Sequence, residues 1–379
     1  MLTCEGCRER LGRFRDGLEE EWDAAVLHLP EHLLYLGNFF PNPNSLNLQS
    51  SSFLLVEREG PVTLFTDNWP ASGVGQDPAE STTSADRVES IHWYSCEGPA
   101  RLRCQAVANA LAERLRSLSV RRLAAETAHL PYTVAAAVDA VSDCEPLLRR
   151  LREVKDPDEL DAIRRGIRTA EAVHAASREL LVPGVREIEL YAGLLDRAVQ
   201  AAESPFVMMC DLASGPRAAE GGGNPTARRI EAGELVILDI FPYVDGYRGD
   251  ITNTLVAGGE PTSDQRELFD LVHAALEAAA AAIRPGTPVA EFCRIIDECY
   301  AGAGKGYQLV HHAGHAIGLG HPEAPELVRE SDRVLSEGMV ITLEPGLYGQ
   351  PTGGLRLEHD YLVTRDGAER LSNHSLGLV

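Results

Sequence analysis

Five side chains with metal-binding chemistry stand in the second half of the chain, each within a short apolar or glycine-rich phrase: Asp239, Asp250, His315, Glu344 and Glu358. A structural zinc ion prefers Cys and His ligands, whereas hard divalent cations prefer carboxylate oxygens. Four carboxylates and one imidazole therefore predict two divalent cations that share carboxylate ligands. A pair of such cations is typical of metal-dependent hydrolases.

The first two carboxylates belong to a predicted hairpin over residues 234–256, ELVILDIFPYVDGYRGDITNTLV. Asp245-Gly246 suits a tight type I′ turn between two strands. In that register Asp239 lies opposite Thr252 and diagonal to Asp250, so both carboxylates share one face, about 7 to 8 Å apart at the backbone. Alternatively, Asp239 ends a strand and Asp250 satisfies a turn. Burial of an aspartate without a counter-charge is costly, which favours the metal site.

The other three residues come from separate phrases. His315 lies in VHHAGHAIGLGHPEAP, where four His and three Gly fall close together. A lone His is usually a satisfied core residue, but this grouping favours a site. Glu344 ends the apolar strand MVITLE, and Glu358 lies in a half-buried strand predicted over residues 354–363. The Gly- and Pro-rich loop 347–354 predicts a hairpin-like return between them.

The elements that position these residues indicate two domains. In the first part, strands are predicted at 23–29, 52–58 and 61–67, and helices at 99–118 and 131–141, which gives an α/β domain. Asp156-Pro157, followed by two acidic residues, predicts the start of a helix. We therefore predict domains at 1–152 and 153–379. Helices in the second domain are predicted at 157–181, 187–202 and 264–283.

Composition excludes several classes of function. The formal net charge of -22 argues against nucleic-acid and anionic-membrane binding, which need clustered Lys and Arg. No stretch has the roughly 18 to 20 apolar residues of a membrane-spanning helix, and the N-terminus lacks a signal-peptide pattern. We therefore expect a cytoplasmic protein whose eight cysteines are reduced. Cys4 and Cys7 have ligand spacing but no convincing second pair, because Cys96 and Cys104 are too far apart.

Six phrases together resemble the M24 metallopeptidases with a creatinase-type N-terminal domain, the group of Xaa-Pro aminopeptidases and prolidases. These are LLYLGNFF, REVKDPDELDAIRRG, LDIFPYVDGYRGDITNT, GHAIGL, TLEPGLY and LRLEHDYLV. The last four, in this order, carry most of the resemblance, which extends over nearly the whole chain. The resemblance implies an α+β fold, with a pita-bread C-terminal domain behind an α/β creatinase-type N-terminal domain.

The resemblance also implies roles for individual residues. The five metal-binding candidates match the five metal ligands of the family, and Glu344 also matches its general base. His311, His321 and Arg356 match residues that contact the substrate or orient a ligand, and Tyr247 matches an aromatic at the substrate. Two divalent ions are implied, manganese above all, with cobalt or zinc able to substitute. A homodimer and a peptide substrate with proline at its second position are implied as well.

Two departures from the family pattern concern substrate contacts. Family peptidases carry a histidine 17 residues before the first metal aspartate, and this chain has Gly222 at that position. The glycine could leave room for a bulkier substrate, or Glu220 or Asn224 could reach into the site. The interval from His315 to His321 is one residue shorter than usual, so His321 is expected to point elsewhere.

Three functions follow from these observations. The first is a manganese-dependent aminopeptidase or dipeptidase acting before proline, supported by the complete ligand set. The second is a related hydrolase for another amide or C–N bond, suggested by Gly222 and the His321 spacing. The third is a catalytically weak or non-catalytic homologue that keeps the fold, although such proteins usually lose ligands.

Overall fold

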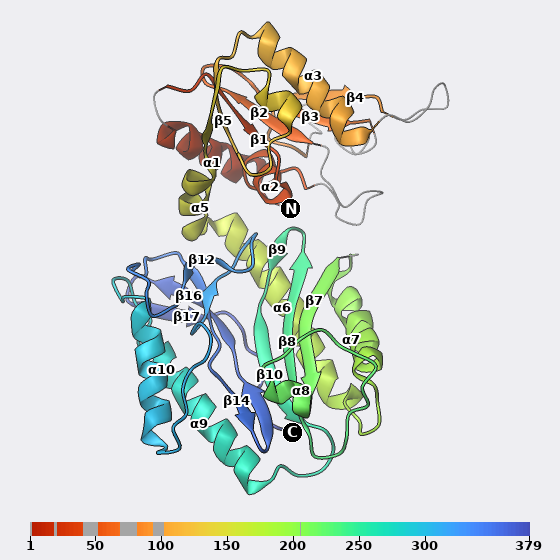
Figure 1. Cartoon of the computed structure of the whole chain (residues 1–379), viewed down its shortest axis with the longest axis vertical. Helices are drawn as coiled ribbons and strands as arrows, with labels where there is room; N and C mark the ends of the chain where they lie inside the picture. The colour runs from red at the N-terminus through yellow and green to blue at the C-terminus, as the bar shows by residue number, and fades with distance from the viewer. Residues whose placement is uncertain (1, 19–20, 41–51, 69–81, 94–101, 205) are drawn as a thin grey trace. The chain divides into compact units, whose positions relative to one another are not determined.

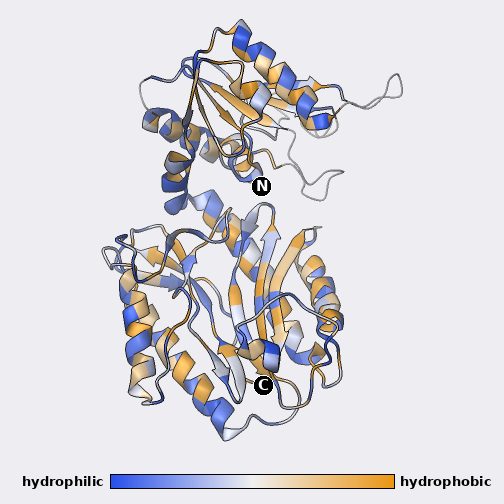
Figure 2. Ribbon diagram, viewed as in Figure 1, coloured by the Kyte–Doolittle hydropathy of each residue, from blue (hydrophilic) through white to orange (hydrophobic). Residues whose placement is uncertain are grey.

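The computed structural model describes residues 2–18, 21–40, 52–68, 82–93, 102–204 and 206–379. It divides into two compact units, Met1–Arg152 and Glu153–Val379, whose elements are labelled in Figure 1. Each unit has its own hydrophobic core. Figure 2 shows hydrophobic residues gathered on the strands, while the helices alternate between hydrophobic and hydrophilic residues along their length. Within the described ranges, no helix combines the length and apolar character needed to cross a bilayer.

The N-terminal unit is built on one mixed six-stranded sheet of order β4-β3-β2-β1-β5-β6. Its strands are β1 (Ala24–Leu27), β2 (Phe53–Glu57), β3 (Val62–Asp67), β4 (Arg87–Ile91), β5 (Arg122–Ala125) and β6 (Ala140–Asp143). Its helices are α1 (Cys4–Gly17), α2 (Pro30–Gly37), α3 (Arg103–Ser117), α4 (Tyr132–Ala135) and α5 (Glu145–Glu153). Strands β1, β2 and β3 pair antiparallel, whereas β4, β5 and β6 join in parallel.

The three strands predicted near the N-terminus are confirmed as β1, β2 and β3. The predicted helix 99–118 corresponds to α3, and its first residues lie outside the described ranges. The predicted helix 131–141 is wrong beyond Ala135, because residues 140–143 instead extend the sheet as β6. Backbone groups at the edge of β5 gain partners from this parallel strand, a non-local pairing that outweighs the local helix preference of an Ala-rich segment.

The described cysteines are all free thiols, as predicted: Cys4, Cys7, Cys104, Cys144, Cys210, Cys293 and Cys299. Cys96 lies outside the described residues. The sulfur atoms of Cys4 and Cys7 contact different partners, the carbonyls of Thr82 and Leu34 respectively, each at 3.6 Å. This pair therefore behaves as packing thiols on α1.

The C-terminal unit contains two sheets and a hairpin, with a pair of helices on each side. Its helices are α6 (Pro157–Leu180), α7 (Glu187–Ala202), α8 (Pro216–Ala219), α9 (Ser263–Ala280) and α10 (Ala290–Gly302). The first sheet, of order β10-β8-β7, has β7 (Val207–Ser214), β8 (Leu235–Val244), β9 (Tyr247–Arg248, paired with β8) and β10 (Ile251–Val256). The second, of order β12-β11-β13-β16-β17, has β11 (His315–Ala316), β12 (Glu323–Glu326), β13 (Val340–Leu343), β16 (His359–Thr364) and β17 (Gly367–Arg370). Strands β14 (Gly346–Gln350) and β15 (Gly353–Arg356) form the hairpin.

The predicted helices of this unit are confirmed as α6, α7 and α9. Helix α6 starts where Asp156-Pro157 predicts, and the side chain of Glu159 accepts a hydrogen bond from the Asp156 amide at 2.9 Å. One core joins α6 and α7 to β7, β8 and β10, and another joins α9 and α10 to β13, β15 and β16. The five metal-binding candidates lie on strands, or within two residues of a strand end, in the sheets between these two pairs of helices. Helix α10 was not predicted, although Phe292, Cys293, Ile296 and Tyr300 mark its buried stripe.

Candidate metal centre

Asp239 and Asp250 come from the hairpin of β8 and β10. The observed register pairs Asp239 with Thr252, as predicted from the Asp245-Gly246 turn. Asp239 is 6% exposed and Asp250 is 2% exposed. Alternate residues of β8 on its other face, such as Leu238 and Ile240, pack into the core with α6 and α7. The hairpin therefore has one apolar face and one face that presents both carboxylates.

His315 and Glu344 are contributed by the second sheet. His315 opens β11, and Glu344 directly follows β13, where its amide donates to the Ala313 carbonyl at 3.0 Å. The imidazole Nε2 of His315 lies 3.4 Å from Asp250 Oδ2 and 3.5 Å from Glu344 Oε1. Gly314 permits this close approach of the strands, because a Cβ there would lie 2.1 Å from the Thr342 carbonyl oxygen.

Glu358 lies between β15 and β16, so the single strand predicted over residues 354–363 is wrong at this point. Its amide donates to the Thr252 carbonyl at 3.0 Å, and the Thr252 hydroxyl donates to Glu358 Oε2 at 2.6 Å. Between β15 and β16, the backbone of Glu358 thus bonds to β10. This pairing places the Glu358 carboxylate, which is 1% exposed, beside the carboxylates of Asp239 and Asp250.

The electrostatics of the centre reflect buried carboxylates without enough positive charge. Burial and the neighbouring carboxylates raise the pKa of Asp239 and Glu358 well above their ordinary values. Burial also raises the pKa of Asp250 to about 7, although His315 opposes the rise. Glu344 differs, because its contact with His312 and the charge of His315 overcome burial and hold its pKa well below the ordinary value.

The donor set fits divalent cations. Within the described part of the chain, Asp239 Oδ1 and Asp250 Oδ1 are buried and have no hydrogen-bond partner. Buried acceptors of this kind are normally satisfied, so they indicate a missing positive partner. Ligand atoms of Asp239, Asp250 and Glu358 lie within 4.8 Å of one another, and so do those of Asp250, His315 and His321. Bound divalent cations would supply Lewis acidity, which polarises a peptide carbonyl and lowers the pKa of water.

Three further histidines surround the carboxylates. His312 Nδ1 lies 3.2 Å from Glu344 Oε1 and is the histidine neighbouring His311 that contacts this carboxylate. His311 instead contacts the Tyr348 hydroxyl at 3.0 Å, and burial lowers its pKa to about 4. His321 Nε2 lies 3.0 Å from Asp250 Oδ2. The expectation that the shortened interval turns His321 away is therefore wrong.

The loop that carries His321 is fixed by a buried ion pair. Lys155 Nζ lies 2.8 Å from Glu323 Oε2, and Glu323 Oε1 accepts a hydrogen bond from the Gly320 amide at 2.7 Å. The Arg248 amide also donates to the Gly318 carbonyl at 3.0 Å. These bonds hold the shortened loop against the hairpin, so that the imidazole of His321 reaches Asp250.

Arg356 is the guanidinium of the centre. It donates to Asp239 Oδ2, to the Tyr348 hydroxyl at 2.8 Å and to the Gly221 carbonyl at 2.7 Å. These contacts fix the orientation of Asp239 Oδ2. They leave Oδ1 without a partner among the described residues, near the carboxylates of Asp250 and Glu358. Arg356 is therefore placed as a residue that orients a ligand, as the resemblance implies.

Comparisons with known proteins identify the family. The model of metallopeptidase family M24 matches residues 161–365, and that of the creatinase/prolidase N-terminal domain matches residues 10–154. The chain belongs to metallopeptidase family M24. An Xaa-Pro dipeptidase of Pyrococcus furiosus is 35% identical over 229 residues, which are 60% of this chain and 65% of the relative. The chain spans less than two thirds of the length of the first curated relatives it matches, 65% and 62%.

Solved structures of this family share the whole fold. An Xaa-Pro dipeptidase from Bacillus anthracis is 27% identical, with a TM-score of 0.82 over 98% of this chain and 99% of that one. A prolidase from Pyrococcus furiosus is also 27% identical, with a TM-score of 0.77 over 96% and 99% of the two chains. The predicted fold, a creatinase-like N-terminal domain and a pita-bread C-terminal domain, is confirmed.

Tyr247 does not take the place expected for a substrate contact in an M24 enzyme. Its side chain is fully buried, and its hydroxyl donates to Glu159 Oε1 of α6 at 3.0 Å. The tyrosine points from β9 toward the core side of the hairpin, opposite the carboxylates. We therefore assign it to packing between β9 and α6, because a fully buried ring with a satisfied hydroxyl offers no surface to a ligand.

The structure also shows what replaces the family histidine at position 222. A Cβ at Gly222 would meet three atoms of Asp211, the nearest being Oδ2 at 2.6 Å. The side chain at this position is thus Asp211 of β7, and neither Glu220 nor Asn224 is among these nearest atoms. The alternative that Gly222 simply opens space for a bulkier substrate is not supported either.

Sequence reasoning missed three residues of the centre. Asp211 lies opposite Asp239 in the β7–β8 register, His312 contacts Glu344, and Tyr348 joins His311 to Arg356. Tyr348 stands four residues after Glu344 in the phrase TLEPGLY, and that spacing could have indicated it. Asp211 gives a weaker signal, an acidic residue in an otherwise apolar strand.

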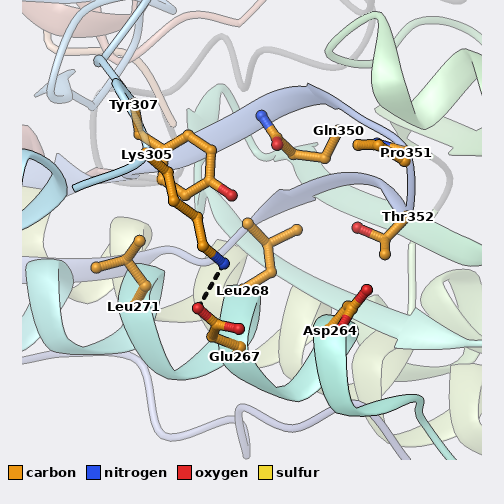
Figure 3. Close-up of a pocket in the computed structure, with 9 residues that line it drawn as sticks. All are labelled: Asp264, Glu267, Leu268, Leu271, Lys305, Tyr307, Gln350, Pro351 and Thr352. Carbon is orange, nitrogen blue, oxygen red and sulfur yellow. Dashed lines mark hydrogen bonds and ion pairs between the residues drawn. The ribbon is translucent and has the colours of Figure 1, made fainter. Parts of the chain in front are cut away.

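A hollow of about 100 Å³ lies apart from these residues, at the tip of the β14–β15 hairpin. Figure 3 shows Thr352 of the tip beside Asp264 of α9, and an ion pair between Lys305 and Glu267. None of the predicted site residues lines this hollow. Its size suits a few water molecules rather than a peptide.

Proposed function

We propose that this M24 protein is a dinuclear metal-dependent peptidase that releases the residue preceding proline from Xaa-Pro substrates. The observation that carries the proposal is the convergence of four buried carboxylates and His315, with two carboxylate oxygens that lack partners among the described residues. Relatives named Xaa-Pro dipeptidase or prolidase support the substrate class.

The proposed roles follow the placement of each side chain. Asp239, Asp250, His315, Glu344 and Glu358 hold the two cations. Glu344 also serves as general base, the role that the resemblance implies, because its carboxylate lies ionised beside His312 and His315 at the centre. The same carboxyl group then returns the proton to the leaving nitrogen.

The residues around the ligands would act on the substrate. His321 lies beside Asp250 and His311 beside Tyr348, so each presents an imidazole at the rim of the centre. We propose that His321 hydrogen-bonds a peptide carbonyl, that His311 acts through Tyr348 because both of its ring nitrogens already have partners, and that Arg356 fixes Asp239. Manganese is the proposed native ion, since carboxylate oxygens with one imidazole suit it, and cobalt or zinc could substitute. A cytoplasmic homodimer is the proposed physiological form, by the resemblance to the family.

The test is a peptidase assay on the full chain with added Mn²⁺. An Xaa-Pro dipeptide and an Xaa-Pro-Xaa tripeptide are compared, and release of the N-terminal residue is measured. We expect turnover of at least one, and its loss by a factor of about 10³ or more in Glu344→Ala, as when a catalytic base is removed. Metal content measured on the same samples shows whether the ions remain. Bound metal with no turnover of either peptide would refute the substrate assignment.

A further inference from the structure

Strand β7 places one more carboxylate, that of Asp211, on the face of the sheet that carries the candidate metal ligand Asp239. Asp211 pairs directly with Asp239, so the two side chains project from the same side of the sheet. Its neighbours Cys210 and Leu212 are buried on the opposite side, against α6 and α7. The Asp211 side chain is 33% exposed, whereas Asp239 is 9% exposed by the same measure. Asp211 therefore lies at the open edge of the centre.

The side chain of Asp211 lies in the space where a side chain at position 222 would begin. A Cβ at Gly222 would lie 2.6 Å from Asp211 Oδ2, closer than real Cβ contacts allow, and the φ of Gly222 is +138°. A histidine at 222 would need both a different backbone and a different residue at 211. The missing imidazole and the extra carboxylate are thus two parts of one local change.

The Asp211 carboxylate retains hydrogen-bonding capacity. Its nearest cation is Arg356, whose Nη1 lies 3.6 Å from Oδ2, beyond hydrogen-bond distance. Arg217, the next basic residue along the chain, is turned to Glu187 and to the Asn224 carbonyl. No hydrogen bond to the Asp211 carboxylate is formed by any residue in the described ranges of the chain. With 33% of its side chain exposed, this carboxylate has room to accept a donor from outside the protein in addition to its contact with Arg356.

Resting on the proposed function, we propose that Asp211 determines specificity, by binding a cationic side chain of the substrate in the space that family members give to the histidine. An imidazole can donate a hydrogen bond to a carbonyl, whereas an ionised carboxylate only accepts. It therefore favours an ammonium or guanidinium group next to the scissile bond. Lysine and arginine side chains form short, charge-assisted hydrogen bonds with carboxylates, and norleucine offers the same apolar stem without the charge.

The test compares binding of L-lysine and L-norleucine, as product analogues, to the Mn²⁺-loaded full chain by calorimetry. We expect lysine to bind about tenfold more tightly than norleucine, as a hydrogen bond to a charged group predicts. Asp211→Asn should remove the preference by weakening lysine alone. Glu220→Gln is the matched control, since it neutralises an exposed carboxylate in the neighbouring loop and should keep the preference.

A second arm measures kcat/KM for Lys-Pro and norleucyl-proline with the same three proteins. The ratio should fall toward one in Asp211→Asn and stay unchanged in Glu220→Gln. An equal loss for both ligands would mean that Asp211 only positions Arg356, and an unchanged ratio would overturn the proposal equally. If neither dipeptide is cleaved while lysine still binds in preference, the proposed peptidase activity fails and the role of Asp211 stands.

Discussion

Neutralising Asp250 should stabilise the metal-free protein, although it removes a proposed metal ligand. The carboxyl group is 2% exposed, and its pKa rises from an ordinary 3.8 to about 7, mainly through burial. At 1.36 kcal/mol per pKa unit, the ionised group costs the fold about 4 kcal/mol.

The sign of the pH dependence follows from the raised pKa. The unfolded group ionises near pH 3.8 and the folded group near pH 7, so the cost grows across this interval and is complete above it. Asp250→Asn should therefore raise the free energy of unfolding most at pH 8 and very little at pH 4. Asp250 Oδ2 faces His315 and His321, and a carboxamide of the same shape fits there without a new cavity.

Bound metal should offset this advantage of the variant. A ligand at 1,000 times its dissociation constant stabilises the folded state by about 4.1 kcal/mol, and Asp250→Asn should lose most of this gain. We would measure thermal unfolding by calorimetry in EDTA and in MnCl₂ for wild type, Asp250→Asn and the control Asp245→Asn. Asp245 lies in the β8–β9 turn with a φ of +52°, which Asn accepts, so this variant should respond to metal like wild type.

The reasoning would be refuted by either of two results. In the first, Asp250→Asn unfolds at a lower temperature than wild type in EDTA at pH 8, which would show that the carboxylate is paired. In the second, Mn²⁺ raises the unfolding temperature of Asp250→Asn and wild type equally. That outcome would place the bound ions elsewhere on the protein.

Three more predictions concern buried polar residues of the C-terminal unit. Thr252→Val removes the 2.6 Å hydrogen bond to Glu358 and should weaken Mn²⁺ binding about tenfold, measured by calorimetry, with thermal unfolding in EDTA little changed. Glu187→Gln should lower the free energy of unfolding by about 3 kcal/mol in urea titrations, because this fully buried carboxylate binds Ser214, Thr226 and an arginine. Burial lowers the pKa of His174 from 6.5 to about 4, so acidification between these values should cost the fold about 3 kcal/mol, and His174→Gln should flatten that pH dependence.

Local sequence patterns were sufficient to predict the hairpin that carries Asp239 and Asp250. A two-residue turn fixes the register of both strands, and the register fixes the face on which each side chain lies. The observed pairing of Asp239 with Thr252 therefore follows from the position of Asp245-Gly246 in the sequence. Caps and apolar periodicity likewise located α6, α7 and α9, since these are properties of short segments.

Contacts between distant segments could not be derived in this way. Glu358 reaches the hairpin only because its backbone leaves one sheet to bond Thr252 of another, 106 residues earlier. His312 and His311 are adjacent in sequence, and only the folded backbone before β11 decides which ring approaches Glu344. Strand β6 formed where a helix was expected, because pairing with β5 decided the conformation.

Position 222 shows that a departure from a family pattern has to be interpreted together with the residue that lies beside it in the structure. Taken alone, a glycine in place of histidine suggests a lost contact and a weakened enzyme. Beside Asp211 the same glycine is a steric requirement, because the carboxylate fills the volume of the absent side chain. Since Asp211 faces the same side of the sheet as Asp239, the exchange adds a carboxylate beside the candidate metal ligands, all five of which are present. A changed substrate preference at an intact set of candidate ligands would explain both residues, whereas decay of the site would explain only one.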